Sequence, residues 1–111
     1  MGVVSYPAST AGIPETEIGA SYASGTSSAT IVSAGANTNG VRVSTVAIFI
    51  DTLTSDGEFK VDGDIIMKAA SFGNSAAGQV AMTGLFVPAG QAIAFTLSNS
   101  NATYYISYEV L

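Results

Sequence analysis

Hydrophobic residues recur at every second position over most of this chain, and this period restricts it to β-structure. In the stretch 93–97, for example, Ile93, Phe95 and Leu97 share one face of an extended strand. No window has the composition or the period of a helix. We therefore expect strands at 29–33, 41–51, 58–62, 64–70, 79–87, 92–98 and 103–110.

Short segments rich in Gly, Asn, Asp and Pro separate the expected strands, as at Asp62-Gly63-Asp64 and at 35–40. Asn, Asp and Gly tolerate the positive φ angles of tight turns. Short strands at this spacing predict an all-β fold, an antiparallel, jelly-roll-like β-sandwich of about seven to eight strands. The length of 111 residues fits one such domain.

The first 26 residues differ from the rest, because they contain Pro7, Pro14 and no sustained alternation. We expect an extended N-terminal arm at 1–26 and the sandwich at 27–111, with a solvated terminus as the alternative for the arm. The larger apolar side chains of the arm are candidates for contacts with a neighbouring molecule: Val3, Val4, Tyr6, Ile13, Ile18 and Tyr22.

Charged residues make up only 10% of the chain, against roughly 25% in an average soluble domain. This shortage predicts that part of the folded surface faces other protein. The stretches 41–50 and 79–87 are apolar on both faces, so either a bulge changes their facing or an outer face meets another subunit. The second alternative assigns subunit contacts to Val46, Ile48, Ile50, Leu85 and Val87, and we add Tyr105 from the last strand.

Several classes of function lack the residues they need. The net charge is −5, and three scattered cations cannot form a nucleic-acid footprint or bring an acidic membrane surface close. Without His or Cys the usual zinc ligands and activated nucleophiles are missing. We expect no enzyme, cofactor, metal, nucleic acid or membrane partner. Residues 1–10 also lack the pattern of a signal peptide, so we expect no export.

Five carboxylates lie close together in sequence, at Asp51, Asp56, Glu58, Asp62 and Asp64. Carboxylate oxygens are ligands that Ca²⁺ prefers, which makes an acidic calcium-binding module one hypothesis. The spacing of an EF-hand loop is absent, and ordinary turn and surface positions are the better explanation of these residues.

Three segments resemble small β-sandwich, jelly-roll-like virion proteins of tailed bacteriophages. They are Ser33-Ala34-Gly35-Ala36-Asn37-Thr38-Asn39-Gly40-Val41, Leu85-Phe86-Val87-Pro88-Ala89-Gly90-Gln91 and Tyr105-Ile106-Ser107-Tyr108-Glu109-Val110-Leu111. Such proteins serve as capsid decoration (cement) proteins, head fibres or tail-fibre modules. The resemblance implies a non-enzymatic homo-oligomer, often a trimer, that is bound to the major capsid protein or another virion protein.

Two functional hypotheses follow from this resemblance. The first is a capsid decoration protein that is assembled in the host cytoplasm onto the capsid surface and stabilises the head lattice. A chain of 111 residues that starts at Met1 favours this hypothesis over a fibre tip. The second is a receptor- or glycan-binding fibre module that would use the loops at 73–78 and 99–101.

Overall fold

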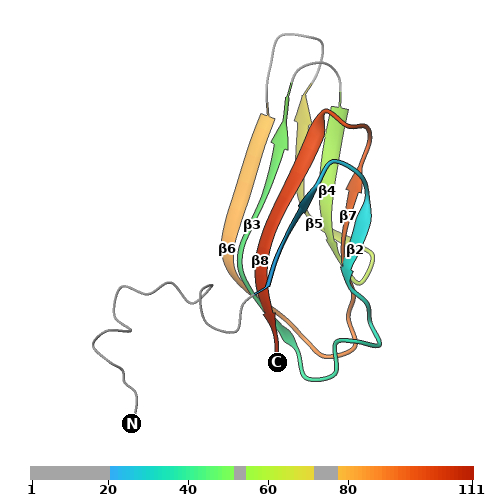
Figure 1. Cartoon of the computed structure of the whole chain (residues 1–111), viewed down its shortest axis with the longest axis vertical. Helices are drawn as coiled ribbons and strands as arrows, with labels where there is room; N and C mark the ends of the chain where they lie inside the picture. The colour runs from blue at the N-terminus through green and yellow to red at the C-terminus, as the bar shows by residue number, and fades with distance from the viewer. Residues whose placement is uncertain (1–20, 52–54, 72–77) are drawn as a thin grey trace, which may run out of the picture.

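The computed structural model describes residues 21–51, 55–71 and 78–111, which form two antiparallel sheets packed face to face (Figure 1). Sheet A contains, in spatial order, β1 (Ser21–Gly25), β8 (Ala102–Val110), β3 (Val41–Ile50) and β6 (Gly78–Val87). Sheet B contains β2 (Ala29–Val32), β7 (Ile93–Leu97), β4 (Ser55–Val61) and β5 (Asp64–Ser71). The all-β sandwich predicted from the sequence is confirmed, with no helix in the described part of the chain.

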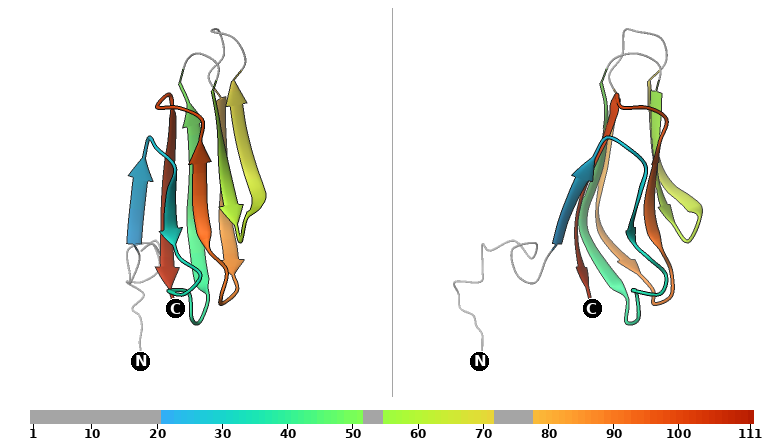
Figure 2. Two further views of the ribbon diagram at one scale, coloured as in Figure 1. Left: turned by 90° about the vertical axis from the view of Figure 1, so that its right-hand side faces the viewer. Right: turned by 45° about the vertical axis from the view of Figure 1, so that its right-hand side comes forward.

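The chain is wound as a double-stranded ribbon. Each strand of the first half pairs with one of the second half: β1 with β8, β2 with β7, β3 with β6 and β4 with β5. Along the ribbon the four pairs lie alternately in sheet A and sheet B (Figure 2). Within sheet A the two pairs are joined by the β3–β8 ladder, and within sheet B by the β4–β7 ladder. This winding is that of a jelly roll, as predicted.

The turn between β4 and β5 shows why the sequence folds this way locally. Asp62 and Gly63 both have positive φ, at 53° and 86°, and they connect Val61 and Asp64, which are partners in the ladder. Two central residues with positive φ form the turn whose twist matches that of a hairpin. The sequence signal at this turn was therefore interpreted correctly.

An aromatic stack joins the two sheets in the core. The Phe95 ring of sheet B lies 4.3 Å from the Tyr104 ring of sheet A, centroid to centroid, and the two planes are nearly parallel. Phe59 extends the stack, with its centroid 5.2 Å from that of Phe95. All three side chains are buried, and valine, isoleucine and leucine side chains from both sheets surround them.

In β3, side chains that the sequence pattern assigned to an outer contact surface point into the core instead. Ser44 is an extra residue in the pairing with β8, because Val43 lies opposite Tyr108 while Thr45 lies opposite Ser107. Side chains alternate with a period of two, so one extra residue exchanges the faces of all that follow. Val46, Ile48 and Ile50 therefore point into the core, and their assignment to an outer face was wrong.

β6 changes its facing at the same level. Gly84 has a φ of +74°, and it falls between the partner pairs Val43–Leu85 and Thr45–Thr83. After this glycine the inward positions are Leu85, which packs against the core, and the fully buried Val87. The assignment of Val87 to an outer contact surface was therefore wrong, whereas Leu85 is only partly buried and its role in a contact stays a prediction. The sequence left a bulge open as the other explanation. The extra Ser44, with the matching change at Gly84, explains why 41–50 and 79–87 are apolar on both faces.

The N-terminal boundary also differs from the prediction. Residues 21–25, assigned to the arm, form β1 and pair with β8 from Ser21–Tyr108 to Gly25–Tyr104. Gly25 permits this pairing because a Cβ at this position would lie only 3.0 Å from the Tyr104 hydroxyl oxygen. The sandwich therefore includes residues before position 27, and the remaining arm positions lie outside the described residues.

A buried asparagine connects two of the segments that carry the family resemblance. The Asn37 side-chain amide donates hydrogen bonds to the carbonyl oxygens of Pro88 (2.8 Å) and Gln91 (3.0 Å). Its Oδ1 accepts a hydrogen bond from the Gly40 amide at 2.8 Å, and its backbone carbonyl accepts one from Gly90 at 2.7 Å. This one residue therefore holds the 33–40 loop against the Pro88–Gln91 turn.

We expect Asn37→Ala to lower the free energy of unfolding by about 3 kcal/mol, because it leaves the buried Gly40 amide and two partly buried carbonyl groups without this partner. Chemical denaturation measures this loss. Asn39→Ala is the matched control, since Asn39 lies in the same loop but makes an exposed hydrogen bond to Leu111. Its effect should stay within about 0.5 kcal/mol. Equal losses in the two variants would contradict the role given to Asn37.

Gly57 in β4 marks a place where the sheets approach closely. A Cβ there would lie 2.8 Å from Ile48 Cγ2 and 2.9 Å from Leu97 Cδ2. Gly57→Ala should therefore overpack the core and lower the free energy of unfolding by about 1–3 kcal/mol. Gly35→Ala adds a methyl group in open space, so thermal melting should separate the two variants clearly. An unchanged stability of Gly57→Ala would contradict this close approach.

Candidate functional site

The outer face of sheet A is the surface with the most unusual composition. We define the sheet A face by the outward positions of its four strands. These are Tyr22, Ser24, Thr103, Tyr105, Ser107, Glu109, Arg42, Thr45, Ala47, Phe49, Gln79, Ala81, Thr83 and Phe86. Its aromatic members are exposed by 64% (Tyr22), 39% (Phe49), 55% (Phe86) and 46% (Tyr105). The remaining positions are mostly small hydroxyl or alanine side chains.

Charge on the sheet A face is confined to one ion pair. Arg42 of β3 lies opposite Glu109 of β8, and the two side chains form a hydrogen-bonded salt bridge. Because the two charges neutralise each other across neighbouring strands, the face as a whole has no net charge. Covering it would require little desolvation of unpaired charge, which is the main cost of burying a polar surface.

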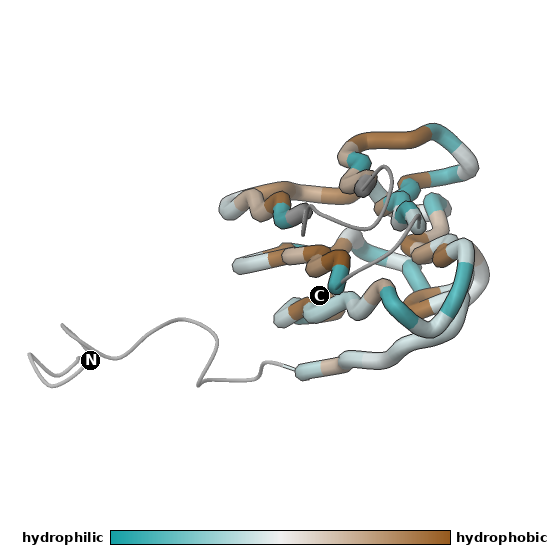
Figure 3. The backbone as a smooth tube through the Cα atoms, turned by 90° about the horizontal axis from the view of Figure 1, so that it is seen from above, coloured by the Kyte–Doolittle hydropathy of each residue, from teal (hydrophilic) through white to brown (hydrophobic). Residues whose placement is uncertain are grey.

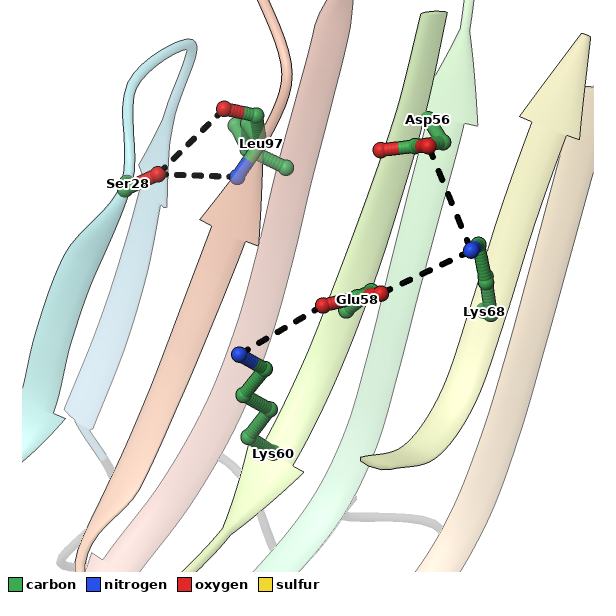
Figure 4. Close-up of polar contacts among 6 residues, drawn as sticks. All are labelled: Ser28, Asp56, Glu58, Lys60, Lys68 and Leu97. Atoms are coloured by element: carbon green, nitrogen blue, oxygen red, sulfur yellow. Dashed lines mark hydrogen bonds and ion pairs between the residues drawn. The ribbon is translucent and has the colours of Figure 1, made fainter. Parts of the chain in front are cut away.

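The outer face of sheet B is built in the opposite way. Asp56, Glu58 and Lys60 occupy alternate outward positions of β4, and Lys68 lies opposite Glu58 on β5 (Figure 4). Lys68 Nζ lies 3.6 Å from Glu58 and 4.0 Å from Asp56, and Lys60 Nζ lies 3.5 Å from Glu58. Such a charged row is suited to water. The sandwich thus has one solvated face and one face with aromatic character.

Figure 3 colours the backbone by hydropathy and shows how hydrophobic and polar residues are distributed along the chain. Hydrophobic positions recur along the strands of both layers. In the described residues, most charged side chains lie in turns or on the strands of sheet B. The few charged residues are therefore unevenly distributed, and the sheet A face carries only the Arg42–Glu109 ion pair.

The aromatic side chains of the sheet A face make defined contacts. Phe49 and Tyr105 meet edge to face, with ring centroids 5.4 Å apart and planes at 84°. The Phe86 ring lies over Gly40, where a Cβ would come within 2.5 Å of the ring. Gly40 also has a φ of +104°, so both backbone and space require glycine there. These contacts hold the rings in place while leaving their outer sides exposed.

Two shallow hollows lie on this face. One, of about 300 Å³, is lined by Tyr22, Ala23, Ser24, Thr45, Tyr105, Ile106 and Ser107. The other, of about 280 Å³, lies at the bulge and is lined by Arg42, Val43, Ser44, Gly84, Leu85 and Phe86. In the first hollow the Ser107 Oγ is buried and has no hydrogen-bond partner. The exposed rings and these hollows give a partner surface both protrusions and depressions to fit.

The contact residues predicted from the sequence divide into three groups. Tyr22 and Tyr105 lie on the sheet A face, where they flank the first hollow. Val46, Ile48, Ile50 and Val87 belong to the interior, whereas Leu85 is partly buried against it and lines the second hollow. The remaining arm residues lie outside the described part of the chain: Val3, Val4, Tyr6, Ile13 and Ile18.

Sequence reasoning missed Phe49 and Phe86 as surface residues. Strict alternation places Phe49 on the same side as Val41 and Val43, but the extra Ser44 reverses this relation. The available signal was Gly84, because an isolated glycine within a strand pattern often marks a bulge.

The carboxylates and loops considered earlier form no cation site in the described residues. No three His, Cys, Asp or Glu side chains gather there as metal ligands would. Asn99 accepts a hydrogen bond from the Asn101 amide at 2.9 Å, which is a local turn contact. Most of the 73–78 loop lies outside the described residues. Nor does the described part of the chain include a helix with the length and apolar character needed to cross a membrane.

Comparisons with known proteins found no matching family model, no matching curated protein and no matching solved structure.

Two serines allow the polar contacts of this fold to be tested. Ser28 Oγ accepts a hydrogen bond from the Leu97 amide at 2.8 Å and donates one to the Leu97 carbonyl at 3.3 Å (Figure 4). Ser28→Ala should therefore lower the free energy of unfolding by about 1–2 kcal/mol. Ser107→Ala removes a hydroxyl group that has no partner, so stability should be unchanged or slightly raised. A clear loss for Ser107→Ala in chemical denaturation would contradict the unpartnered state.

Proposed function

We propose that this protein is a non-enzymatic structural protein that assembles with other proteins through the sheet A face, as a decoration protein on the capsid of a tailed bacteriophage. The observation that carries the proposal is the difference between the two outer faces. Sheet B presents a row of ion pairs, whereas the sheet A face presents four exposed aromatic side chains and one neutral ion pair. Exposed apolar surface of this kind marks interaction sites.

The architecture supports this proposal. Jelly rolls are a recurrent architecture of viral capsid proteins and lectins. Two of the segments that resemble phage virion proteins, 33–41 and 85–91, are separate in sequence but meet through the hydrogen bonds of Asn37. The resemblance thus involves one connected end of the sandwich and not unrelated stretches.

The proposed mechanism is mass action. A protein that binds only the mature lattice stabilises that lattice by its free energy of binding. Burying one exposed aromatic or large aliphatic side chain contributes about 1.5–3 kcal/mol, before the costs of association. The sheet A face offers four such rings in every copy. Repeated over a lattice, even a modest contact in each copy would add up to a large stabilisation of the shell.

The hollow beside Tyr22 and Tyr105 favours a second candidate function. Aromatic rings next to polar side chains can bind sugar rings, and Ser24 and Thr45 line this hollow beside the two tyrosines. In this case the protein would be a glycan-binding module of a fibre. The lining is mostly apolar, however, and the aromatic surface extends beyond the hollow to Phe49 and Phe86. That extent fits a protein surface better than one sugar ring.

The decisive experiment is co-sedimentation with expanded, DNA-free heads of tailed bacteriophages. We expect the protein to sediment with the heads to a saturating ratio. Tyr105→Ser and Phe49→Ser should each weaken binding about tenfold or more, because each removes a ring from the contact surface. Ile65→Ser is the matched control: Ile65 is 53% exposed, but it lies opposite Lys60 at the outer side of sheet B. It should bind as the unmodified protein does.

Two results would contradict the proposal. One is an equal loss of binding in Ile65→Ser and Tyr105→Ser, which would mean that the two faces are not distinguished. The other is saturable binding to glycans, abolished by Tyr105→Ser, with no affinity for heads; this result would establish the second candidate function instead.

A further inference from the structure

β6 is an open edge of sheet A. Within the described residues it pairs with β3 on one side and with no strand on the other. It is ten residues long, and none of these residues is charged or a proline. The backbone amide and carbonyl groups along its outer side are therefore available to another strand, which natural proteins usually prevent.

The other three edges are better protected. β1 and β2 are short, with five and four residues. β5 carries Asp64 and Lys68, and its pairing with β4 is interrupted by an extra residue at Ile66. Short edges, charged side chains and bulges are the usual means of preventing strand pairing between molecules. β6 has only the positive φ of Gly84 as an irregularity, which leaves the stretch 79–83 unprotected.

We propose that β6 pairs antiparallel with β6 of a second copy, joining two four-stranded A sheets into one continuous sheet of eight strands. A twofold axis at Ala81 places Ala81 opposite its equivalent, Val80 opposite Met82 and Gln79 opposite Thr83. Residues that are opposite in this register lie on the same face of the sheet. Val80 and Met82 therefore meet on the inner side, and the uncharged polar pair meets on the outer side.

Two observations favour a second copy as the occupant. First, a twofold pairing places residues at equal distances from the axis opposite each other, and β6 has no charged residue that could meet a like charge there. Second, Val80 and Met82 pack against the core but remain only partly buried at the open edge. Pairing in this register would cover both side chains with their counterparts from the second copy. The stretch 79–83 thus offers hydrogen-bonding groups and apolar side chains in one self-complementary arrangement.

This inference names the self-association contact of the proposed structural protein. It depends on the backbone edge of β6, although the outward side chains Gln79, Ala81 and Thr83 also belong to the sheet A face. Twofold pairing closes at two copies, whereas a trimer requires a different contact between unlike surfaces. The molar mass in solution therefore distinguishes the twofold pair from the trimer that the family resemblance implies.

Ala81→Lys tests the inference directly. Two lysines would face each other across the twofold axis at the separation of opposed side chains, roughly 5 Å, and like charges there are destabilising. Light scattering coupled to size exclusion should give twice the monomer mass of 11.2 kDa for the unmodified protein. For the variant the dissociation constant should rise at least tenfold, with a circular dichroism spectrum that shows a folded β-protein.

Ala70→Lys is the matched control, because it makes the same change on the protected edge strand β5 and should leave the dimer intact. A charge exchange completes the test. Mixing Ala81→Lys with Ala81→Glu should restore association, since opposite charges then meet at the axis. Amide hydrogen exchange at residues 79–83 should slow as the protein concentration rises.

The inference is overturned if the unmodified protein is a monomer up to about millimolar concentration, or if Ala81→Lys and Ala70→Lys behave alike. It is also overturned if mixing the oppositely charged variants restores no dimer, or if a trimer forms that Ala81→Lys leaves unchanged. These results come from the molar mass in solution, whereas head binding is measured with Tyr105→Ser, Phe49→Ser and Ile65→Ser, so the failure of either proposal can be recognised separately.

Discussion

The change of facing at Ser44 and Gly84 is the constraint on which the rest of this structure depends. One extra residue in β3 and a glycine with positive φ beside it in β6 reverse the two faces of both strands at the same level. Without this change, Val46 and Ile48 would leave the core and Phe49 would enter it. The packing of the interior and the composition of the sheet A face are therefore two results of a single irregularity.

The few charged residues of the described chain are divided unequally between the two outer faces of the sandwich. Most of the charges in the described residues lie on sheet B or in turns, where they form ion pairs or meet solvent. Exposed ion pairs of this kind contribute little to stability, so their main effect is to keep one side of the molecule hydrated. The opposite side is left with rings, hydroxyl groups and alanines, which other proteins can cover at low cost.

Local patterns in the sequence were sufficient to predict most of the fold. Alternation located the strands, and Asp62-Gly63 identified a hairpin turn because only a few residue types adopt its backbone angles. The two-sided pattern of 41–50 could not be resolved in the same way. A bulge is determined by the pairing of β3 with β8, which are separated by about half the chain, so no local window contains it. Tyr105 lies on β8, where alternation is uninterrupted, so it was placed outside correctly. Phe49 follows the extra Ser44 of β3, so alternation placed it on the wrong face.

The pairing of β1 with β8 has a consequence for how the domain can be connected to other chains. Ser21, where the sandwich begins, is the ladder partner of Tyr108, three residues from the end of the chain. The polypeptide thus enters and leaves the fold at neighbouring points. A domain of this kind can be inserted into a loop of a larger protein, or permuted by joining its ends through a short linker, with little disturbance of its interior.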